Sequence, residues 1–581
     1  MALNFSRYAI FAVIAVLAVL LLREWTDFSK DFEDQRKQAI LDQAKASPSS
    51  YAETNSNTIP TIVDEANSTA ELPSDTSITQ QSLEPILNVA NNTPIVVETD
   101  TLKITIDPQG AKIIQAELLT HLTERGENGV PLKLLEKNPL RTYTAFDGVV
   151  TSNNNSENIL FSSSAQTFSF VNQEQGDVTL TANLSNNVII EKTFTFSNGV
   201  YEIKSSTTVY NRSADQWQGR YLAQIRRDSS EDPGTDDAPM GMRSYLGTAT
   251  TNADSPYHKI SFKDIAKENY EAKVTGGWIA MIQHYFVSAW IPDQNSDHTF
   301  YTRLLKQNLN TIGFVDSTVS IAANESKTFS STFYVGPKNQ YRLGALAENL
   351  ELTVDYGFLW WLSQPLYVLL YFFATGELHI FDKVYTLFSG FQNWGLAIIA
   401  LTVVVKAVFF KLSAASYRSM ANMRRVQPKL LALRERHSSD KAAQSKAMME
   451  LYKKEKINPL GGCLPILVQM PVFIALYWAL IESVELRHAP FFLWIKDLSV
   501  MDPLFILPVL MGATMWFQQR MNPAPPDPMQ AKVMQWMPII FTFFFLWFPA
   551  GLVVYWVSNN ILSIAQQWYI TKKIERENAP S

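Results

Sequence analysis

Cysteine is almost absent from this sequence of 581 residues, since Cys463 is the only one. A single cysteine excludes a disulfide within the chain and any metal site built from several cysteines. The sequence also lacks the HExxH, GxSxG, Walker A and strand-linked GxGxxG motifs of metalloproteases, hydrolases and nucleotide-binding proteins. The acidic cluster 228–237 lacks EF-hand spacing, and His284 lies among aromatic residues, as a hydrogen-bonded core histidine would. We therefore expect no catalytic residue, no metal, no cofactor and no enzyme activity.

Charge is missing from four long runs in the C-terminal part, 384–405, 457–481, 503–519 and 533–571. The last run, about 39 residues, would be about 58 Å long as one helix, which exceeds one bilayer crossing. Phe548-Pro549-Ala550-Gly551 interrupts it in the middle. These runs predict a membrane core over 384–571 with five transmembrane helices. Their predicted ranges are about 390–411, 460–481, 503–519, 533–548 and 551–569.

The N-terminus carries a shorter apolar stretch, 8–22, between Arg7 and Arg23. At about 15 residues it is short for a span of about 20 and resembles a signal-peptide core, but no small-residue cleavage site follows. We predict an uncleaved transmembrane anchor over 1–26. The next segment, 27–94, is predicted to be a flexible linker, because most of it is rich in Ser, Thr, Asn and Pro and poor in apolar residues.

Apolar and polar residues alternate between 95 and 350, which predicts a large antiparallel β-sandwich domain. The clearest alternating segments are 177–184, 189–196, 201–210 and 327–335. The uncharged run 274–292 contains Gly, Gln and His and is predicted to be buried sandwich. The run 356–376 is long and very apolar, so it is either a span or an interfacial helix. We favour an amphipathic interfacial helix within 351–383.

The distribution of basic residues predicts the orientation. The segment from Lys411 to Lys456 contains about 12 basic residues and only about 4 acidic ones. This excess of positive charge predicts that the segment lies inside the cell. The segment 412–456 is predicted to be a helical hairpin with its turn at Ser438-Ser439-Asp440. Both termini, including a short tail over 572–581, are then cytoplasmic, and residues 27–383 are periplasmic. Anionic lipids, ribosomal RNA or an acidic polypeptide would all fit the arginines of this hairpin, which are Arg418, Arg424, Arg425, Arg434 and Arg436.

Lys406 is the most informative single residue. It follows the apolar stretch 396–405, and Thr402 lies one helical turn earlier on the same face. A charge at the centre of a membrane helix costs about 2.5–3.5 kcal/mol and tends to face a hydrated cavity. Alternatively, because Lys411 is only about 7.5 Å further along the helix, Lys406 could reach the cytoplasmic headgroups. The uncharged runs contain no acidic residue to neutralise Lys406, which leaves room for an anion on a visiting molecule.

Further polar residues interrupt the apolar runs. One stripe at helical spacing comprises Trp556, Asn559, Ser563 and Gln566, and Gln469 adds an amide between two prolines. These groups could form hydrogen bonds between helices, each of which would stabilise the bundle by about 0.6 kcal/mol. Together with an unpaired cation, however, several polar groups favour a water-filled groove. The helix predicted at 533–548 has a greasy face that could adapt to varied apolar partners or simply face lipid. Its members are Met534, Met537, Phe541, Phe544 and Phe545.

Several short motifs carry a family resemblance. In the C-terminal part they are Asn393-Trp394-Gly395, 458–465 (NPLGGCLP), 469–473 (QMPVF), 483–487 (SVELR) and 546–551 (LWFPAG). In the outer domain they are 277–286 and 334–338 (YVGPK). With these motifs the sequence resembles the YidC/Oxa/Alb family of membrane protein insertases, and within it the Gram-negative type with a large periplasmic domain.

The resemblance implies a five-helix core around a hydrophilic groove that opens to the cytoplasm and lipid and is closed to the periplasm. Lys406 matches a basic groove residue that is often Arg; Lys keeps the charge but lacks the planar fork. Thr402, Tyr555 and Trp556 match positions that contact substrate. The outer domain resembles a super-β-sandwich similar to sugar-mutarotase folds, which gives no warrant for sugar chemistry.

The resemblance also implies a function in the bacterial inner membrane: insertion, folding and assembly of integral membrane proteins, alone or with the Sec translocon (SecYEG and SecDF). The other expected partners are nascent membrane proteins, lipids and, through 412–456 only, the ribosome; no DNA and no small-molecule substrate are expected. Two alternatives remain at this point. A transporter or channel would use the same groove but predicts inverted repeats with broken helices, which we do not see. An envelope enzyme or glycan-binding protein would work through 95–345.

Overall fold

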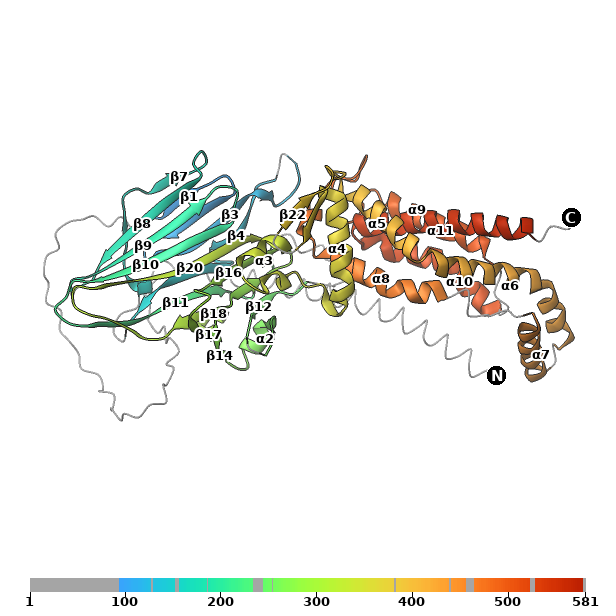
Figure 1. The fold of residues 1–581 in the computed structure, drawn as a ribbon, viewed down its shortest axis with the longest axis horizontal. Coiled ribbons are helices and arrows are strands. Elements are labelled where there is room, and N and C mark those ends of the chain that lie inside the picture. Colours follow the sequence, from blue (N-terminus) through green and yellow to red (C-terminus); the bar gives the residue numbers. More distant parts are fainter. Residues whose placement is uncertain are drawn as a thin grey trace.

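The computed structural model describes residues 93–577 except for 127–128, 152–155, 185, 233–243, 253, 381–382, 438–439, 456–463 and 523–527. The predicted anchor 1–26 and nearly all of the predicted linker 27–94 lie outside the described residues. Figure 1 shows a β-sandwich at one end of the molecule and a bundle of helices at the other.

The β-sandwich consists of two sheets, in which nearly all neighbouring strands are antiparallel. The eleven-stranded sheet contains β1 (Ile95–Glu98), β2 (Leu102–Asp107), β3 (Lys112–Leu122), β4 (Pro131–Lys137), β5 (Thr142–Val150), β7 (Thr167–Ser169), β11 (Trp217–Arg227), β14 (Glu271–Thr275), β17 (Asp297–Leu305), β18 (Leu309–Asp316) and β19 (Val319–Ile321). The nine-stranded sheet contains β6 (Ser162–Ser163), β8 (Gln175–Asn183), β9 (Val188–Ser197), β10 (Glu202–Asn211), β12 (Gly247–Thr250), β13 (His258–Ile260), β15 (Ile279–Ile282), β16 (Phe286–Ile291) and β20 (Ser326–Pro337).

The alternating sequence pattern predicted these strands correctly. The four segments singled out from the sequence form β8, β9, β10 and β20, and in β9 buried and partly buried residues alternate along the whole strand. The uncharged run 274–292 forms the end of β14, then β15 and β16, and it is buried in the sandwich as predicted.

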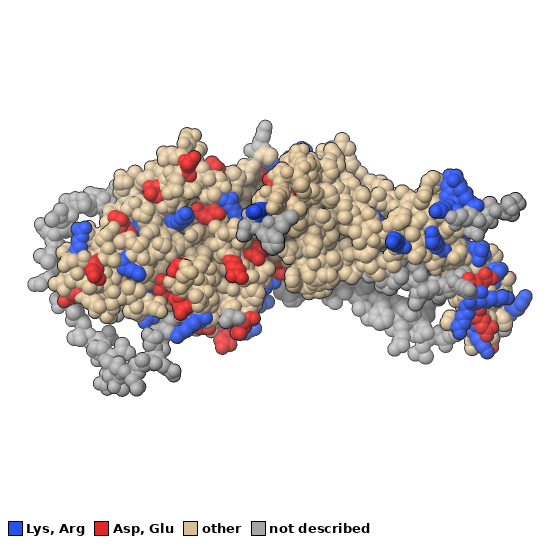
Figure 2. All heavy atoms as spheres, in the orientation of Figure 1, with Lys and Arg blue, Asp and Glu red and all other residues tan. Residues whose placement is uncertain are grey.

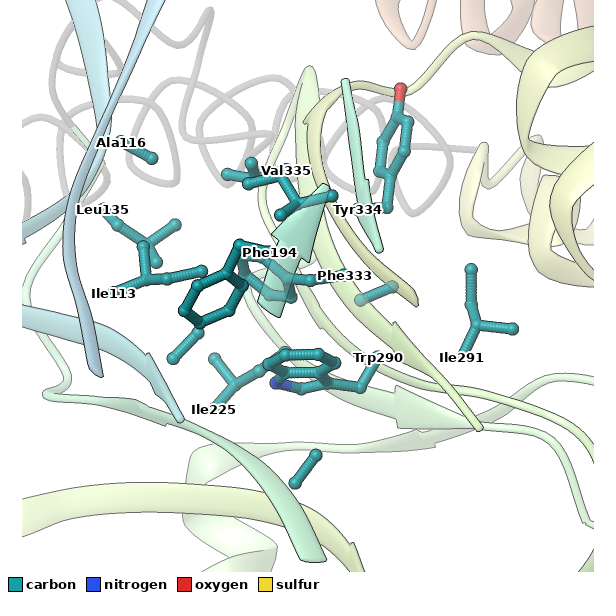
Figure 3. Close-up of a cluster of buried hydrophobic side chains, with 14 of the residues drawn as sticks. Ile113, Ala116, Leu135, Phe194, Ile225, Trp290, Ile291, Phe333, Tyr334 and Val335 are labelled. Atoms are coloured by element: carbon teal, nitrogen blue, oxygen red, sulfur yellow. The ribbon is translucent and has the colours of Figure 1, made fainter. Parts of the chain in front are cut away.

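The core of the sandwich lies between the two sheets (Figure 3). Trp290, Phe194 and Phe333 of the nine-stranded sheet meet Ile113 and Ile225 of the other sheet, and all five side chains are at most 1% exposed. Because burying one large apolar side chain is worth about 1.5–3 kcal/mol, this core can stabilise the domain without a disulfide.

The described helices lie mainly after residue 339. They are α2 (Phe262–Ile265), α3 (Gln340–Leu346), α4 (Trp360–Thr375), α5 (Trp394–Val408), α6 (Phe410–Arg436), α7 (Lys441–Lys454), α8 (Leu464–Ile481), α9 (Ile506–Met521), α10 (Pro528–Phe544) and α11 (Ala550–Glu577). The predicted hairpin at 412–456 is formed by α6 and α7, and the carboxylate of Asp440 caps α7 by accepting from the backbone N–H groups of Ala442 and Ala443.

Several predicted helix boundaries differ from those in the structure. The first core helix begins at Trp394, where the Asn393 side chain accepts from the N–H of Leu396; the uncharged residues before it belong partly to a hairpin of β21 (Glu377–Ile380) and β22 (Lys383–Thr386). That helix ends at Val408, and α6 continues after a bend of 67°. The tail predicted at 572–581 is helical as far as it is described, because α11 continues to Glu577.

Few of the described helices meet a strict length test for crossing a membrane. By length and composition, Gly357–Thr375 is long and apolar enough, whereas α5 and α6 pass only as a bent pair. Val468–Ile481 and Ala531–Trp547 are apolar but shorter. Figure 1 shows α4 running across the bundle, at the junction with the sandwich, rather than along it. The five-span topology and the interfacial position of α4 remain predictions.

The sandwich and the helical bundle share a polar joint in which the loop after α8 fits against the sandwich. Glu482 pairs with Lys338 at 2.8 Å, and both side chains are 2% exposed. Glu485 accepts hydrogen bonds from Asn339 (3.1 Å) and Tyr367 (2.9 Å), and burial raises the pKa of its carboxyl group. The ring of His284 is hydrogen-bonded to the carbonyl of Ile481.

Candidate functional site

The site is built on α5, whose sequence is apolar except near its last turn. One face of this helix packs into the bundle through Ala397, Ile398, Leu401 and Val405. Lys406 continues this buried face, because it follows Thr402 by one turn. The helix therefore carries a cation at the inner side of the bundle.

Lys406 contacts α11 rather than open solvent. Its side chain is 8% exposed, and its ammonium group donates a 2.7 Å hydrogen bond to the hydroxyl of Ser563, which in turn donates to the carbonyl of Asn559. No carboxylate among the described residues pairs with Lys406.

The other predicted groove residues on α5 and α11 lie in the same region. Gln566 donates to the carbonyl of Phe410 at 3.3 Å, at the start of α6. We call Lys406, Asn559, Ser563 and Gln566 the polar seam, because they lie between α5–α6 and α11. Thr402 is fully buried and donates to the carbonyl of Ile398 in its own helix. The seam is thus packed around Lys406, with Asn559 and Gln566 only partly buried.

Aromatic side chains form one wall beside the seam. The ring of Trp556 packs edge-on against Phe473 of α8, with centroids 4.6 Å apart, and contacts Phe545 at 5.2 Å. Its buried indole N–H has no hydrogen-bond partner among the described residues. Tyr555 is 4% exposed in the bundle core, and Gln469 is half-buried on α8. A buried donor without a partner costs free energy, so this N–H is available to an acceptor that enters the site.

The predicted greasy face divides in two. Met537 and Phe544 are each 38% exposed, and Met534 and Phe541 are partly buried. Phe545, in contrast, is 2% exposed and belongs to the bundle core. The outward face of α10 also includes Val533, Trp536, Ile539 and Ile540, which the prediction omitted.

Sequence reasoning missed a second polar face on α11. Asn560 donates to the hydroxyl of Thr514 at 3.1 Å, and Gln567 donates to the side chain of Asn522 at 2.9 Å. Both are at most 4% exposed and connect α11 with the α9 region. The sequence did contain an indication of this face: Asn560 and Gln567 are seven residues apart, which places both amides on the same side of a helix.

The opposite ends of the helical bundle differ in charge. The predicted loop arginines lie on α6, where Arg418, Arg424, Arg425 and Arg436 are exposed and Arg434 is partly buried. Figure 2 shows basic side chains gathered at the end of the molecule formed by α6, α7 and the end of α11. Between that end and the sandwich the visible surface is nearly free of charge, as a lipid-facing belt requires.

The end of the bundle next to the sandwich is closed by a packed loop. The N–H of Ala550 donates to the carbonyl of Val500 (2.7 Å) and that of Gly551 to Leu498 (2.9 Å), which holds the start of α11 against the loop. Asp502 is fully buried, and its carboxylate accepts from the N–H of Leu507 and the indole of Trp494.

No metal centre is apparent in the part of the chain that is described, where no three His, Cys, Asp or Glu side chains form a ligand group. The site therefore consists of a cation, hydroxyl and amide groups, and an aromatic wall. Such an arrangement can bind and orient a polar segment.

Comparisons with known proteins match both parts of the chain. The family profile described as YidC periplasmic domain matches residues 94–369, and the one described as 60Kd inner membrane protein matches residues 360–577. Over 519 residues the chain is 49% identical to a protein of Pseudomonas fluorescens (strain SBW25) named membrane protein insertase YidC, covering 88% of this chain and 90% of the relative. A protein of Marinomonas sp. (strain MWYL1) with the same name is 46% identical over 99% of this chain and 100% of its own length. A solved structure titled as an active YidC insertase with its first transmembrane domain resolved aligns over 82% of this chain and 92% of its own, with 18% identity and a TM-score of 0.36.

Proposed function

Since this chain belongs to the YidC family of membrane protein insertases, we propose that its polar seam receives the polar flank of an incoming membrane segment. The protein inserts membrane proteins into the inner membrane, and the comparisons give no support to a transporter or channel. The observation that carries the proposal is the buried Lys406, whose partner among the described side chains is a neutral hydroxyl.

A client carboxylate would compete well for Lys406. Hydrogen bonds between two charged groups are roughly twice as strong as those to a neutral acceptor. An acidic flank would therefore replace the Ser563 hydroxyl, while Ser563 would keep its bond to the carbonyl of Asn559. This exchange lowers the free-energy cost of bringing a charged flank to membrane depth.

Opening of the seam requires α11 to separate from α5 and α6. The hydrogen bonds to be broken are the Lys406–Ser563 bond and the long Gln566–Phe410 bond of 3.3 Å, and the apolar packing of α11 against its neighbours must open as well. The unpaired indole N–H of Trp556 would then donate to a backbone carbonyl of the client. The aromatic wall would shield the client from lipid while its polar flank is bound.

The apolar part of the client would leave along the outer face of α10 into lipid. Exposed Met and Phe side chains such as Met537 and Phe544 adapt to different apolar surfaces. The spanning helices are short, for example 15 residues in α5 and 16 in α9, so they would thin the bilayer locally. Partitioning of the apolar segment drives the step, and no covalent reaction is needed.

The proposed topology places α6, α7 and both termini in the cytoplasm and the sandwich in the periplasm. The support is the positive-inside rule, since the exposed arginines lie on α6, at the end of the bundle away from the sandwich. These arginines would meet anionic lipid or the ribosome. The Sec translocon is a further proposed partner, because clients that it releases need the same lateral path into lipid.

Site-specific photocrosslinking tests the proposed path. A photoreactive residue at Trp556 or Gln469 should crosslink to a nascent single-span client, because both positions lie beside the seam. The matched control is Gln567, which lies on the same helix but faces Asn522 of the α9 region. Equal crosslinking from Gln567 and Trp556 would contradict the proposed path.

A further inference from the structure

A β-hairpin and the loop after it display large apolar side chains that the insertion path does not use. Among the described strands, β21 and β22 pair only with each other, and the loop after β22 continues into α5. We call the exposed side chains the hairpin patch: Val384 (54% exposed), Tyr385 (47%), Leu387 (65%), Phe388 (37%) and Phe391 (45%). An isolated two-stranded hairpin is marginally stable in water, and a contiguous apolar patch marks an interaction surface.

The backbone beneath the patch is fixed to the end of α4. The N–H of Leu387 donates to the carbonyl of Gly376 at 3.0 Å. Gly376 ends α4 with φ at 81°, and a Cβ there would clash with the carbonyl of Phe388. Likewise, a Cβ on Gly390 would clash with the carbonyl of Ala374. The backbone that carries the patch is therefore packed closely against the end of α4.

The patch also has a well-packed inner side. Phe388 packs edge-on against Phe372 of α4 with centroids 5.2 Å apart, and Phe391 stacks on Phe373 at 6.2 Å. One side of each of these two rings is thus buried against α4. The remaining exposed area is left for a partner.

The position of the patch indicates what that partner is. Asn393, two residues after Phe391, caps α5 and donates to the carbonyl of Phe491 at 3.2 Å. Next to that contact, Phe492 is 51% and Leu493 86% exposed. The patch is thus part of an apolar rim at the sandwich end of the bundle, and it borders the nearly uncharged belt visible in Figure 2.

The chemistry of the patch matches a membrane surface. Lys383 is the only charged residue between 383 and 393, and it is exposed beside Val384 and Tyr385. Aromatic side chains with a flanking Lys are typical of the boundary between headgroups and acyl chains.

We infer that the hairpin patch binds the lipid leaflet facing the β-sandwich and thereby holds the start of α5 at the membrane surface. Lys406 is about 18 Å along the helix from Trp394 at 1.5 Å per residue. A fixed start would set the depth of Lys406 in the bilayer. The inference rests on the membrane location of the helices and not on the role proposed for Lys406.

Fluorescence quenching in proteoliposomes tests this inference. In a Cys463→Ser background, Leu387→Cys is labelled with an environment-sensitive fluorophore, and the vesicles contain phospholipid with a spin label high on its acyl chain. The expected result is blue-shifted emission that the spin-labelled lipid quenches several-fold. The matched control is Val171→Cys, which is 40% exposed on the sandwich and should stay unquenched.

Two results would overturn the inference. Emission from position 387 as in water, with no more quenching than at position 171, would mean that the patch faces solvent. Blue-shifted emission without quenching would mean that protein, and not lipid, covers the patch. Leu387 is 65% exposed, so its replacement should leave the fold intact in either case.

Discussion

The ammonium group of Lys406 and the hydroxyl of Ser563 lie 2.7 Å apart although 157 residues separate them in the chain. The bond joins α5 to α11 and gives a buried cation a neutral acceptor. A cation held in this way is stable in the resting protein and still attracts an anion.

Replacing Ser563 with alanine should destabilise the protein, because the buried ammonium group loses an acceptor. Leaving a charged group unsatisfied costs on the order of 1.5–3 kcal/mol, which should appear as a lower Tm in detergent. In a Lys406→Met background the same change should have little effect. An equal loss of Tm in both backgrounds would show that Ser563 stabilises the bundle independently of Lys406.

Removing one partner of the Lys338–Glu482 pair should weaken the joint between the sandwich and the bundle. Both side chains are 2% exposed, and an unpaired buried charge costs about 3–5 kcal/mol. Lys338→Met should therefore lower the Tm strongly, and adding Glu482→Met should restore part of it. Lys327→Met, at an exposed position near the start of β20, the strand that ends just before Lys338, is the control and should change little. A Tm for Lys338→Met within error of the control would contradict this account.

Stability should fall in mild acid because of His121. Burial first, and then Arg487 and His488, lower its pKa from 6.5 to about 4. A histidine whose pKa is lower in the folded than in the unfolded protein stabilises the folded state fully when the pH is above the unfolded pKa. This stabilisation is lost as the pH falls from about 6.5 toward 4. This loss is about 2 kcal/mol at pH 5. His121→Phe removes the titration and keeps the ring contact with Phe286, so it should reduce the drop in Tm between pH 7.5 and pH 5. The same drop in both proteins would exclude His121 as a cause; His437→Asn, in the turn after α6, is the control.

The sequence was sufficient to predict what local patterns determine. Period-two alternation predicted β8, β9, β10 and β20, and the Phe548-Pro549 break predicted the separation of α10 from α11. The helical spacing of Thr402 and Lys406 predicted their shared face, and the spacing on α11 predicted that Ser563 lies on a polar stripe. The contact between Ser563 and Lys406 itself was found only in the structure.

Features that depend on contacts between distant parts of the chain could not be predicted from local sequence patterns. The hairpin β21–β22 was not predicted: β21 lies in the segment 351–383, which was predicted as an interfacial helix region, and most of β22 lies in the uncharged run that was assigned to the helical core. An apolar run of this length fits a strand or a helix, and periodicity alone cannot separate them. The strands of the hairpin are fixed by the end of α4. The burial of Phe545 and the joint at Glu482 depend likewise on partners far away in the chain.

The most direct test of the central claim is insertion of a single-span client with an acidic flank into proteoliposomes that contain Lys406 variants. Lys406→Ala and Lys406→Glu should lower insertion by about tenfold or more, which corresponds to about 1.4 kcal/mol, while Lys406→Arg should retain it. Lys411→Ala, which removes an exposed charge five residues further on, should leave it nearly unchanged. Unaltered insertion by both Lys406→Ala and Lys406→Glu would remove Lys406 from the mechanism.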